Sequence, residues 1–243
     1  MSDLAEAGPS QPGGGDQTLF LHAWQTYRKV LDHNYLFHRE VYALLRRVVL
    51  AEAPKPFRFL DIACGDAAAS KPALLGTNVG HYYGIDVSRP ALELARRELD
   101  SLGCPVTILE QDFVAALAGW REPVDVAWIG LSLHHLLPQG KLELIRSVRR
   151  VLDSRGLLLI WEPTTLAGED RLEWIARFET EIRALWSALS EDESDAMVSH
   201  VRASDYPETA SRWQALGRDA GFGSVRELYV APTNLARVYC FRD

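Results

Sequence analysis

The sequence predicts an α/β fold with a doubly wound, mostly parallel sheet covered by helices on both faces. Strand-like apolar runs alternate with helical stretches from residue 57 to residue 161. This alternation is typical of parallel strands joined by right-handed crossovers. Two further strand-like runs close to the C-terminus are separated by a short turn, which predicts an antiparallel hairpin at a sheet edge. We therefore expect a seven-stranded sheet with helical lid elements.

The N-terminal region is expected to contain a tail and a helical lid. Residues 1–17 are rich in Gly, Pro and small polar residues, a composition typical of a disordered tail. They lack the basic segment and apolar run of a signal peptide. From Leu19 to Glu52 the apolar residues fall at helical spacing, which predicts two helices that meet near Asp32–Asn34. We expect residues 18–53 to form the lid and residues 18–243 to form one domain.

The remaining elements follow from hydrophobic runs and turn residues. The first five strands are expected at Phe57–Ile62, His81–Ile85, Val106–Leu109, Val124–Ile129 and Leu157–Trp161. The helices between them are expected near Ala68–Leu75, Pro90–Leu102, Val114–Ala118 and Lys141–Leu152. A helical insertion over residues 164–208, amphipathic from Leu166 to His200, then interrupts the sheet. The chain continues with a helix near Thr209–Ala220 and the final strands Val225–Val230 and Leu235–Phe241.

Composition restricts the class of partner and the compartment. The net charge of −7 and the pI near 5.5 disfavour broad nucleic-acid binding, which requires clustered Lys and Arg, although a local basic patch stays open. Three cysteines without paired spacing fit a reducing cytoplasm. No stretch reaches the roughly 18 apolar residues of a membrane span. We expect a cytoplasmic protein with no membrane partner.

A turn rich in small residues follows the first strand, in the segment FLDIACGDAAAS over residues 59–70. Ligands of open α/β sheets bind at the carboxyl ends of strands, and Gly65 allows a close approach to the backbone. Asp86 ends the next strand 21 residues after Gly65, about the spacing at which a carboxylate meets ribose hydroxyls. The sequence thus predicts a nucleoside-binding site.

The same region disfavours a dinucleotide. The pyrophosphate pattern requires three glycines, whereas this chain has Ala63, Gly65 and Ala68 at those positions. Carboxylates also gather at the strand ends: Asp61, Asp66, Asp86 and Asp112. They would repel a pyrophosphate but suit a ligand with a sulfonium, an ammonium and ribose hydroxyls. Asp61 and Asp66 could instead only cap the turn or the next helix.

Taken together, the motifs FLDIACGD, GIDVS, LEQDF, VDVAWIGLSLHHL and VLDSRGLLLIWEP over residues 57–163 resemble those of class I S-adenosylmethionine (SAM) dependent methyltransferases, which have a Rossmann-like fold. The resemblance implies that SAM is the cofactor. By that resemblance, the turn from Ala63 through Gly65 to Asp66 would hold the methionine portion of SAM, Asp86 the ribose, and Asp112 with Phe113 the adenine. Gly130 and Leu131 would border the methyl-donor pocket, and Asp61 and Val87 are further cofactor-binding candidates. The family usually has glycine at the positions where this chain has Ala63 and Ala67. This difference affects the local contacts of the backbone.

Acceptor-side candidates follow the fourth strand and occupy the helical elements. His134 or His135 could act as a general base, or could only pack within the loop. Further candidates for the lid and the facing wall are Tyr27, Tyr35, His38, Arg39, His200 and Tyr206, with core packing as the alternative. Asp32, His33 and His38 lack a further ligand at suitable spacing, so we expect no metal site.

These observations predict methyl transfer from SAM to a small-molecule nucleophile by direct displacement. Two alternatives stay open. The segments ASDYPET and AGFGSV loosely resemble enzymes that modify transfer RNA with SAM or carboxy-SAM, for which Arg146, Arg149 and Arg150 form the nearest basic run. The other alternative is a non-catalytic SAM-binding protein.

Overall fold

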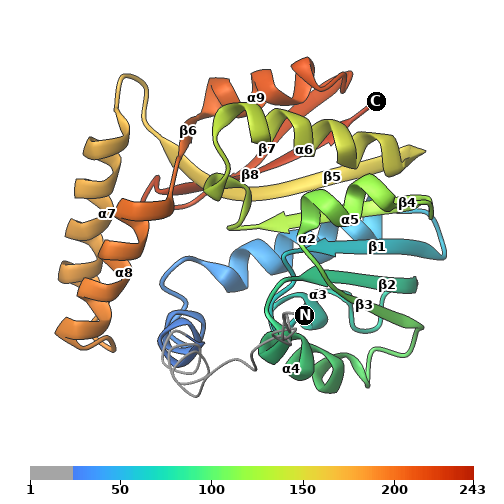
Figure 1. The fold of residues 1–243 in the computed structure, drawn as a ribbon, viewed down its shortest axis with the longest axis horizontal. Coiled ribbons are helices and arrows are strands. Elements are labelled where there is room, and N and C mark those ends of the chain that lie inside the picture. Colours follow the sequence, from blue (N-terminus) through green and yellow to red (C-terminus); the bar gives the residue numbers. More distant parts are fainter. Residues whose placement is uncertain (1–23) are drawn as a thin grey trace, which may run out of the picture.

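A doubly wound sheet with strand order β3-β2-β1-β4-β5-β8-β7 forms the centre of the computed structural model, which describes residues 24–243 (Figure 1). Its strands are β1 (Phe57–Ile62), β2 (Val79–Asp86), β3 (Val106–Glu110), β4 (Val124–Gly130), β5 (Leu152–Thr165), β7 (Ser224–Val230) and β8 (Ala236–Arg242). The first five strands pair in parallel, whereas β8 is antiparallel to β5 and to β7. The predicted fold class is therefore confirmed. The expected tail over residues 1–17 lies outside the described residues.

Helices cover both faces of this sheet, as the period of two along each strand requires. The helices are α2 (His38–Glu52), α3 (Ser70–Leu74), α4 (Arg89–Leu99), α5 (Phe113–Gly119), α6 (Pro138–Val151) and α9 (Ala210–Asp219). Phe59 packs in one core cluster with residues of α2, α3 and α4. Its neighbour Leu60 packs in a second cluster with residues of α5, α6 and α9. Successive residues of β1 thus face opposite layers, and both layers are visible in Figure 1.

The helical insertion consists of two helices, α7 (Arg171–Leu185) and α8 (Glu191–Ser204). The sequence indicated one amphipathic stretch from Leu166 to His200, but the structure interrupts it after Leu185. A new helix begins instead at a capping box, in which Ser190 and Glu193 satisfy each other's backbone N–H groups. A two-residue strand, β6 (Glu208–Thr209), then pairs with the end of β5. Two residues are too few to give a strand pattern, so β6 could not be predicted.

The insertion also contacts the N-terminal helical segment. Residues 24–32 are helical, and Lys29 of this helix forms a 2.7 Å ion pair with Glu193 of α8. Val30 joins Trp174 and Trp186 in a third core cluster. Helix 24–32, α7 and α8 therefore form one packed unit beside the carboxyl ends of the strands (Figure 1). Within residues 24–243, no helix combines the length and the apolar character needed to cross a bilayer.

Candidate active site

The turn after β1 lies at the centre of the site because β1 pairs with both β2 and β4. The N–H of Gly65 donates a 2.9 Å hydrogen bond to Asp86 Oδ2, so the two residues singled out by spacing are in direct contact. Gly65 has φ 54°, and a Cβ at this position would have no heavy atom within 4 Å. The space beside the turn is thus open to a ligand.

Two alanines in this turn adopt a backbone conformation that favours glycine. Ala63 has φ 57° and Ala67 has φ 56°. Left-handed backbone costs an L-residue about 1–2 kcal/mol. These are the two positions at which the methyltransferase motif usually has glycine. The departure in sequence therefore leaves the left-handed geometry in place and adds local strain.

Asp86 holds the ends of β2 and β1 together. In addition to the Gly65 bond, its Oδ1 accepts a 2.8 Å hydrogen bond from the N–H of Ser88. A carboxylate oxygen has two lone-pair sites, so these bonds leave acceptor capacity for a ribose hydroxyl. The adjacent Val87 is 67% exposed. The ribose role of Asp86 stays a prediction with compatible geometry, and so does the cofactor contact expected of Val87.

The carboxylates of Asp61 and Asp66 have different surroundings. Asp61 is buried and accepts a 2.7 Å hydrogen bond from the Tyr82 hydroxyl. Burial raises the pKa of Asp61 to about 6, and the Tyr82 bond opposes this rise. Asp66 accepts 3.0 Å hydrogen bonds from the Ala68 N–H and from the indole N–H of Trp24. Asp66 therefore anchors the N-terminal helix above the turn.

The proposed adenine end of the site lies at β3. The N–H of Gln111 donates to the carbonyl of Asp86, which brings the segment after β3 next to β2. Asp112 is the N-cap of α5, and its Oδ1 accepts from the N–H groups of Val114 and Ala115. Phe113 is half-buried against the core. Asp112 thus has a clear structural role, and its contact with adenine stays a prediction.

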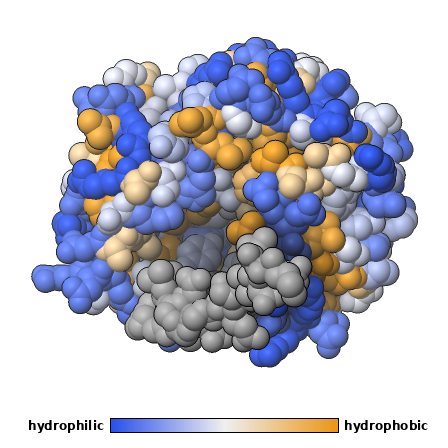
Figure 2. Space-filling model, in the orientation of Figure 1, coloured by the Kyte–Doolittle hydropathy of each residue, from blue (hydrophilic) through white to orange (hydrophobic). Residues whose placement is uncertain are grey.

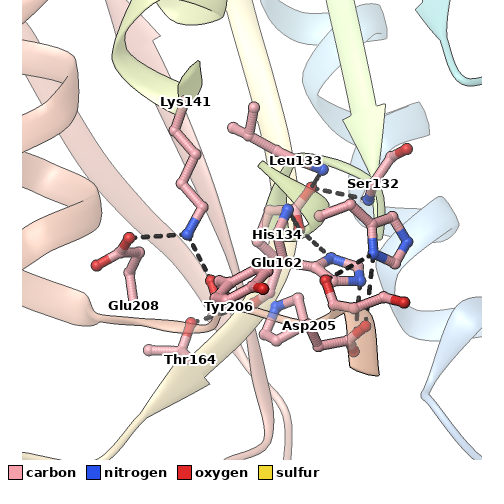
Figure 3. Close-up of polar contacts among 12 residues, drawn as sticks. Ser132, Leu133, His134, Lys141, Glu162, Thr164, Asp205, Tyr206 and Glu208 are labelled. Atoms are coloured by element: carbon pink, nitrogen blue, oxygen red, sulfur yellow. Dashed lines mark hydrogen bonds and ion pairs between the residues drawn. The ribbon is translucent and has the colours of Figure 1, made fainter. Parts of the chain in front are cut away.

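A buried glutamate shapes the turn after β4. Gly130 ends β4, and Leu131 follows with φ 54°. Glu162 Oε1 accepts from the N–H groups of Ser132 and Leu133 at 3.1 and 2.8 Å. Its Oε2 accepts from the N–H of His134 at 3.2 Å and lies 2.7 Å from His134 Nδ1 (Figure 3). Glu162 is fully buried. Glu162 was not among the residues predicted from the sequence, although a charged residue at the end of the apolar run LLLIW is a signal of a buried functional group.

Three of the predicted histidines gather around a second missed residue, Asp205. His134 Nε2 lies 3.5 Å from Asp205 Oδ2, and His135 Nδ1 lies 3.5 Å from Asp205 Oδ1. His200 Nε2 is 4.0 Å from the same Oδ1. Burial, and next the adjacent His134, lower the pKa of His135, which favours a neutral imidazole at pH 7. Tyr206 joins this group through its N–H, which donates to the carbonyl of His134.

The four predicted residues of the N-terminal lid lie in three separate places. The Tyr27 hydroxyl lies 3.1 Å from His38 Nε2, and burial lowers the pKa of His38 to about 3, so this imidazole is neutral. Tyr35 lies elsewhere: it stacks on Trp186, and its hydroxyl accepts from the N–H of Ala188. Arg39 is exposed and donates to the carbonyl of Asp32.

Tyr42 of α2 is an aromatic residue that was not selected from the sequence. Burial raises the pKa of its phenol, and its ring lies 5.5 Å from the Trp128 ring of β4, measured between the ring centroids. Its helical spacing with core residues of α2 concealed this position, because the same pattern is expected of a packing residue.

This chain is similar to known proteins in two ways: part of its sequence matches a family model, and its fold matches solved structures. Residues 59–156 match the family model described as a methyltransferase domain. No curated protein matches the sequence significantly. The chain is similar in structure to an O-methyltransferase family protein from Burkholderia thailandensis, with 19% identity and a TM-score of 0.61 over 87% of this chain and 57% of that one.

Two further solved structures are similar. One is the methyltransferase CalO1 of calicheamicin biosynthesis in its S-adenosylhomocysteine (SAH) bound form, with 15% identity and a TM-score of 0.58 over 82% of this chain and 53% of that one. The other is a protein from Bordetella parapertussis, with 18% identity and a TM-score of 0.62 over 84% of this chain and 67% of that one. Identities this low show a shared fold, and this chain spans little more than half the length of the first two proteins.

Proposed function

We propose that this chain is a class I SAM-dependent methyltransferase that transfers the methyl group of SAM to a nucleophilic atom of an enclosed small molecule. The observation that carries the proposal is the position of the His134–His135 turn. It follows β4, and β4 pairs directly with β1, which leads into the Gly65 turn. A methyl donor held at the β1 turn and an acceptor beside the imidazoles would therefore be neighbours.

The chemistry requires alignment more than activation. The acceptor lone pair forms a bond to the methyl carbon as the carbon–sulfur bond breaks. The electron pair of that bond stays on sulfur, which leaves as the neutral thioether of SAH. The protein contributes mainly by aligning acceptor, carbon and sulfur. Burial keeps the His135 ring neutral by lowering its pKa, and the His134–His135 turn would orient the acceptor, while a proton lost by an acceptor hydroxyl passes to bulk solvent.

Enclosure of the site supports a small acceptor. Helix 24–32 is connected to the β1 turn by the bond from Trp24 to Asp66 and to α8 by the ion pair from Lys29 to Glu193. Figure 2 shows a hollow near the middle of the face that carries these elements. A site walled by helical elements suits a small ligand and excludes water during transfer. The lid over residues 18–53 and the insertion over 164–208 are parts of this proposal.

The position of the basic run disfavours transfer RNA as the acceptor. Arg149 and Arg150 occupy the last turn of α6. This helix runs from the end of β4 back to the start of β5, so its last turn lies at the amino ends of the strands. Arg146 donates to the Asp219 carbonyl, and Arg149 pairs with Asp243. This run therefore does not provide a basic surface at the carboxyl ends of the strands.

Calorimetry and a turnover assay test the proposal. We expect SAM and SAH to bind with micromolar or tighter affinity and NAD not to bind. Release of SAH is then measured with panels of small phenols, alcohols and amines, and in parallel with bulk transfer RNA. His135→Ala should lower turnover while SAM affinity is kept. Methyl transfer to RNA alone would refute the small-molecule acceptor. SAM binding without turnover on any acceptor would favour the non-catalytic alternative.

A further inference from the structure

We propose that His134, His135, His200 and Asp205 form a binding site for a divalent transition-metal ion, with zinc as the best match. One ligand atom from each of His134, His135 and Asp205 lies within 4.8 Å of the others. His200 Nε2 lies 4.0 Å from Asp205 Oδ1 but outside this group, so its exposed imidazole would turn toward the carboxylate to become the fourth ligand. The group joins the turn after β4 to the end of α8, two segments that are far apart in the sequence. No metal site was expected from the sequence, where only His33 and His38 near Asp32 were weighed as metal ligands.

Two of the separations are close to those around a tetrahedral ion. Zinc binds imidazole nitrogen and carboxylate oxygen at about 2.0–2.2 Å, which places neighbouring ligand atoms of a tetrahedron about 3.3–3.6 Å apart. His134 Nε2 lies 3.5 Å from Asp205 Oδ2, and His135 Nδ1 lies 3.5 Å from Asp205 Oδ1. The same distances are too long for good hydrogen bonds. Their spacing therefore fits an ion between the side chains better than direct contact.

Asp205 supplies a second, independent indication. Its side chain is 7% exposed, and its Oδ1 is buried without a hydrogen-bond partner among the described residues. An unsatisfied buried polar atom costs about 1–3 kcal/mol, and more when it is charged. A cation bound between the imidazoles would satisfy this oxygen.

Glu162 completes the arrangement from behind His134. Its carboxylate lies 2.7 Å from His134 Nδ1 and fixes a proton on that nitrogen, which leaves the lone pair of Nε2 directed at Asp205. Metal-bound histidines usually make this contact with a carboxylate. His135 Nδ1 lies 3.3 Å from the Ser204 carbonyl, a long contact that the ring would give up when it binds the ion with its proton on Nε2.

The ligand set determines the class of ion. Three imidazoles and one carboxylate favour zinc, cobalt or nickel over magnesium or calcium, which prefer oxygen ligands. The side chains of His135 and His200 are 37% and 61% exposed, so an ion can enter from solvent. This inference goes beyond the proposed function, because the ion is bound whether or not an acceptor is present.

Direct titration of the full-length protein tests the site. The protein is treated with a chelator, dialysed, and titrated with Zn²⁺, Co²⁺ or Mg²⁺ alone by calorimetry and visible absorption. We expect one Zn²⁺ per chain, the intense visible bands of tetrahedral Co²⁺, and no Mg²⁺ binding. Absence of Zn²⁺ binding by the folded protein overturns the proposal. SAM affinity is measured separately on the metal-free protein, so failure of this inference is distinguishable from failure of the proposed function.

Variants locate the ion. His135→Ala and His200→Ala change exposed side chains, so both should fold, as thermal melts will verify. We expect each to weaken Zn²⁺ binding by at least about tenfold, the smaller loss seen when a supporting residue of a metal site is changed. His33→Ala, on an exposed histidine outside the cluster, is the matched control. Equal affinity in His135→Ala, His200→Ala and the wild type would place the ion elsewhere and overturn the assignment.

Discussion

Glu162→Gln is the most informative single change at this site. The substitution keeps the shape of the side chain but removes its charge and replaces one oxygen with an NH₂ group. In the wild type, the two oxygens accept from three backbone N–H groups and face the His134 ring. If the amide oxygen takes the place of Oε1, the NH₂ group faces the N–H of His134, and two donors then oppose each other.

The expected cost follows from counting these contacts. A hydrogen bond to a charged group contributes about 1.5–3 kcal/mol and a neutral one about 0.5–1.5, while a buried N–H without a partner costs about 1–3 kcal/mol. The neutral amide no longer has the desolvation cost of the buried Glu162 carboxylate, which offsets part of this loss. We expect a destabilisation of about 2–4 kcal/mol, which lowers Tm by roughly 5–15 °C for a chain of this size.

Thermal and urea unfolding, followed by circular dichroism, measure this change. Glu227→Gln is the matched control, because Glu227 is 30% exposed and pairs with Arg237 near the surface. Such pairs contribute about 0–1 kcal/mol. A Glu162→Gln protein with the Tm of the control would refute the reasoning, since the carboxylate would then not hold the turn after β4.

Three further changes test other contacts. Asp86→Ala should lower SAM affinity about ten- to hundredfold in calorimetry, the worth of one charged hydrogen bond. Lys141→Met should destabilise the fold by about 3 kcal/mol in urea, because the fully buried Lys141 pairs at 2.7 Å with Glu208 (Figure 3); the double variant with Glu208→Gln should recover most of this loss. Burial raises the pKa of Asp61 from 3.8 to about 6 in the folded state, so the wild-type protein loses stability as the pH rises through that range. The free energy of unfolding of Asp61→Asn should therefore rise by about 3 kcal/mol relative to the wild type between pH 4 and pH 7.

Each of these tests has an outcome against it. Unchanged SAM affinity in a folded Asp86→Ala protein means that the ribose assignment is wrong. If the double variant at Lys141 and Glu208 is no more stable than Lys141→Met, the loss comes from packing and not from an unpaired charge. A pH-independent stability difference between Asp61→Asn and the wild type would show that Asp61 does not ionise in this range.

Local sequence patterns were sufficient to predict most of the fold. Alternation at Phe59 and Leu60 reflects two covered faces, and the contact between Gly65 and Asp86 follows from parallel strands ending at one edge. By contrast, Glu162 and Asp205 act on histidines far along the chain, and no local periodicity encodes such a contact. The pairing of β4 with β5 brings Glu162 to His134, whereas the end of α8 brings Asp205. The break after Leu185 has one sequence signal, the capping box at Ser190 and Glu193, and the continuous apolar pattern around it concealed that signal.

The bond from Trp24 to Asp66 gives the protein a built-in optical probe. Of the seven tryptophans, Trp24 donates its indole N–H to a carboxylate of the β1 turn, whereas the five at positions 128, 161, 174, 186 and 213 are buried in the core. A ligand whose ammonium group pairs with Asp66 would displace the Trp24 indole from this carboxylate. The polarity of the surroundings of the indole would then change. Fluorescence emission should therefore shift on addition of SAM, and Trp24→Phe should remove the shift while the signal of the core tryptophans persists.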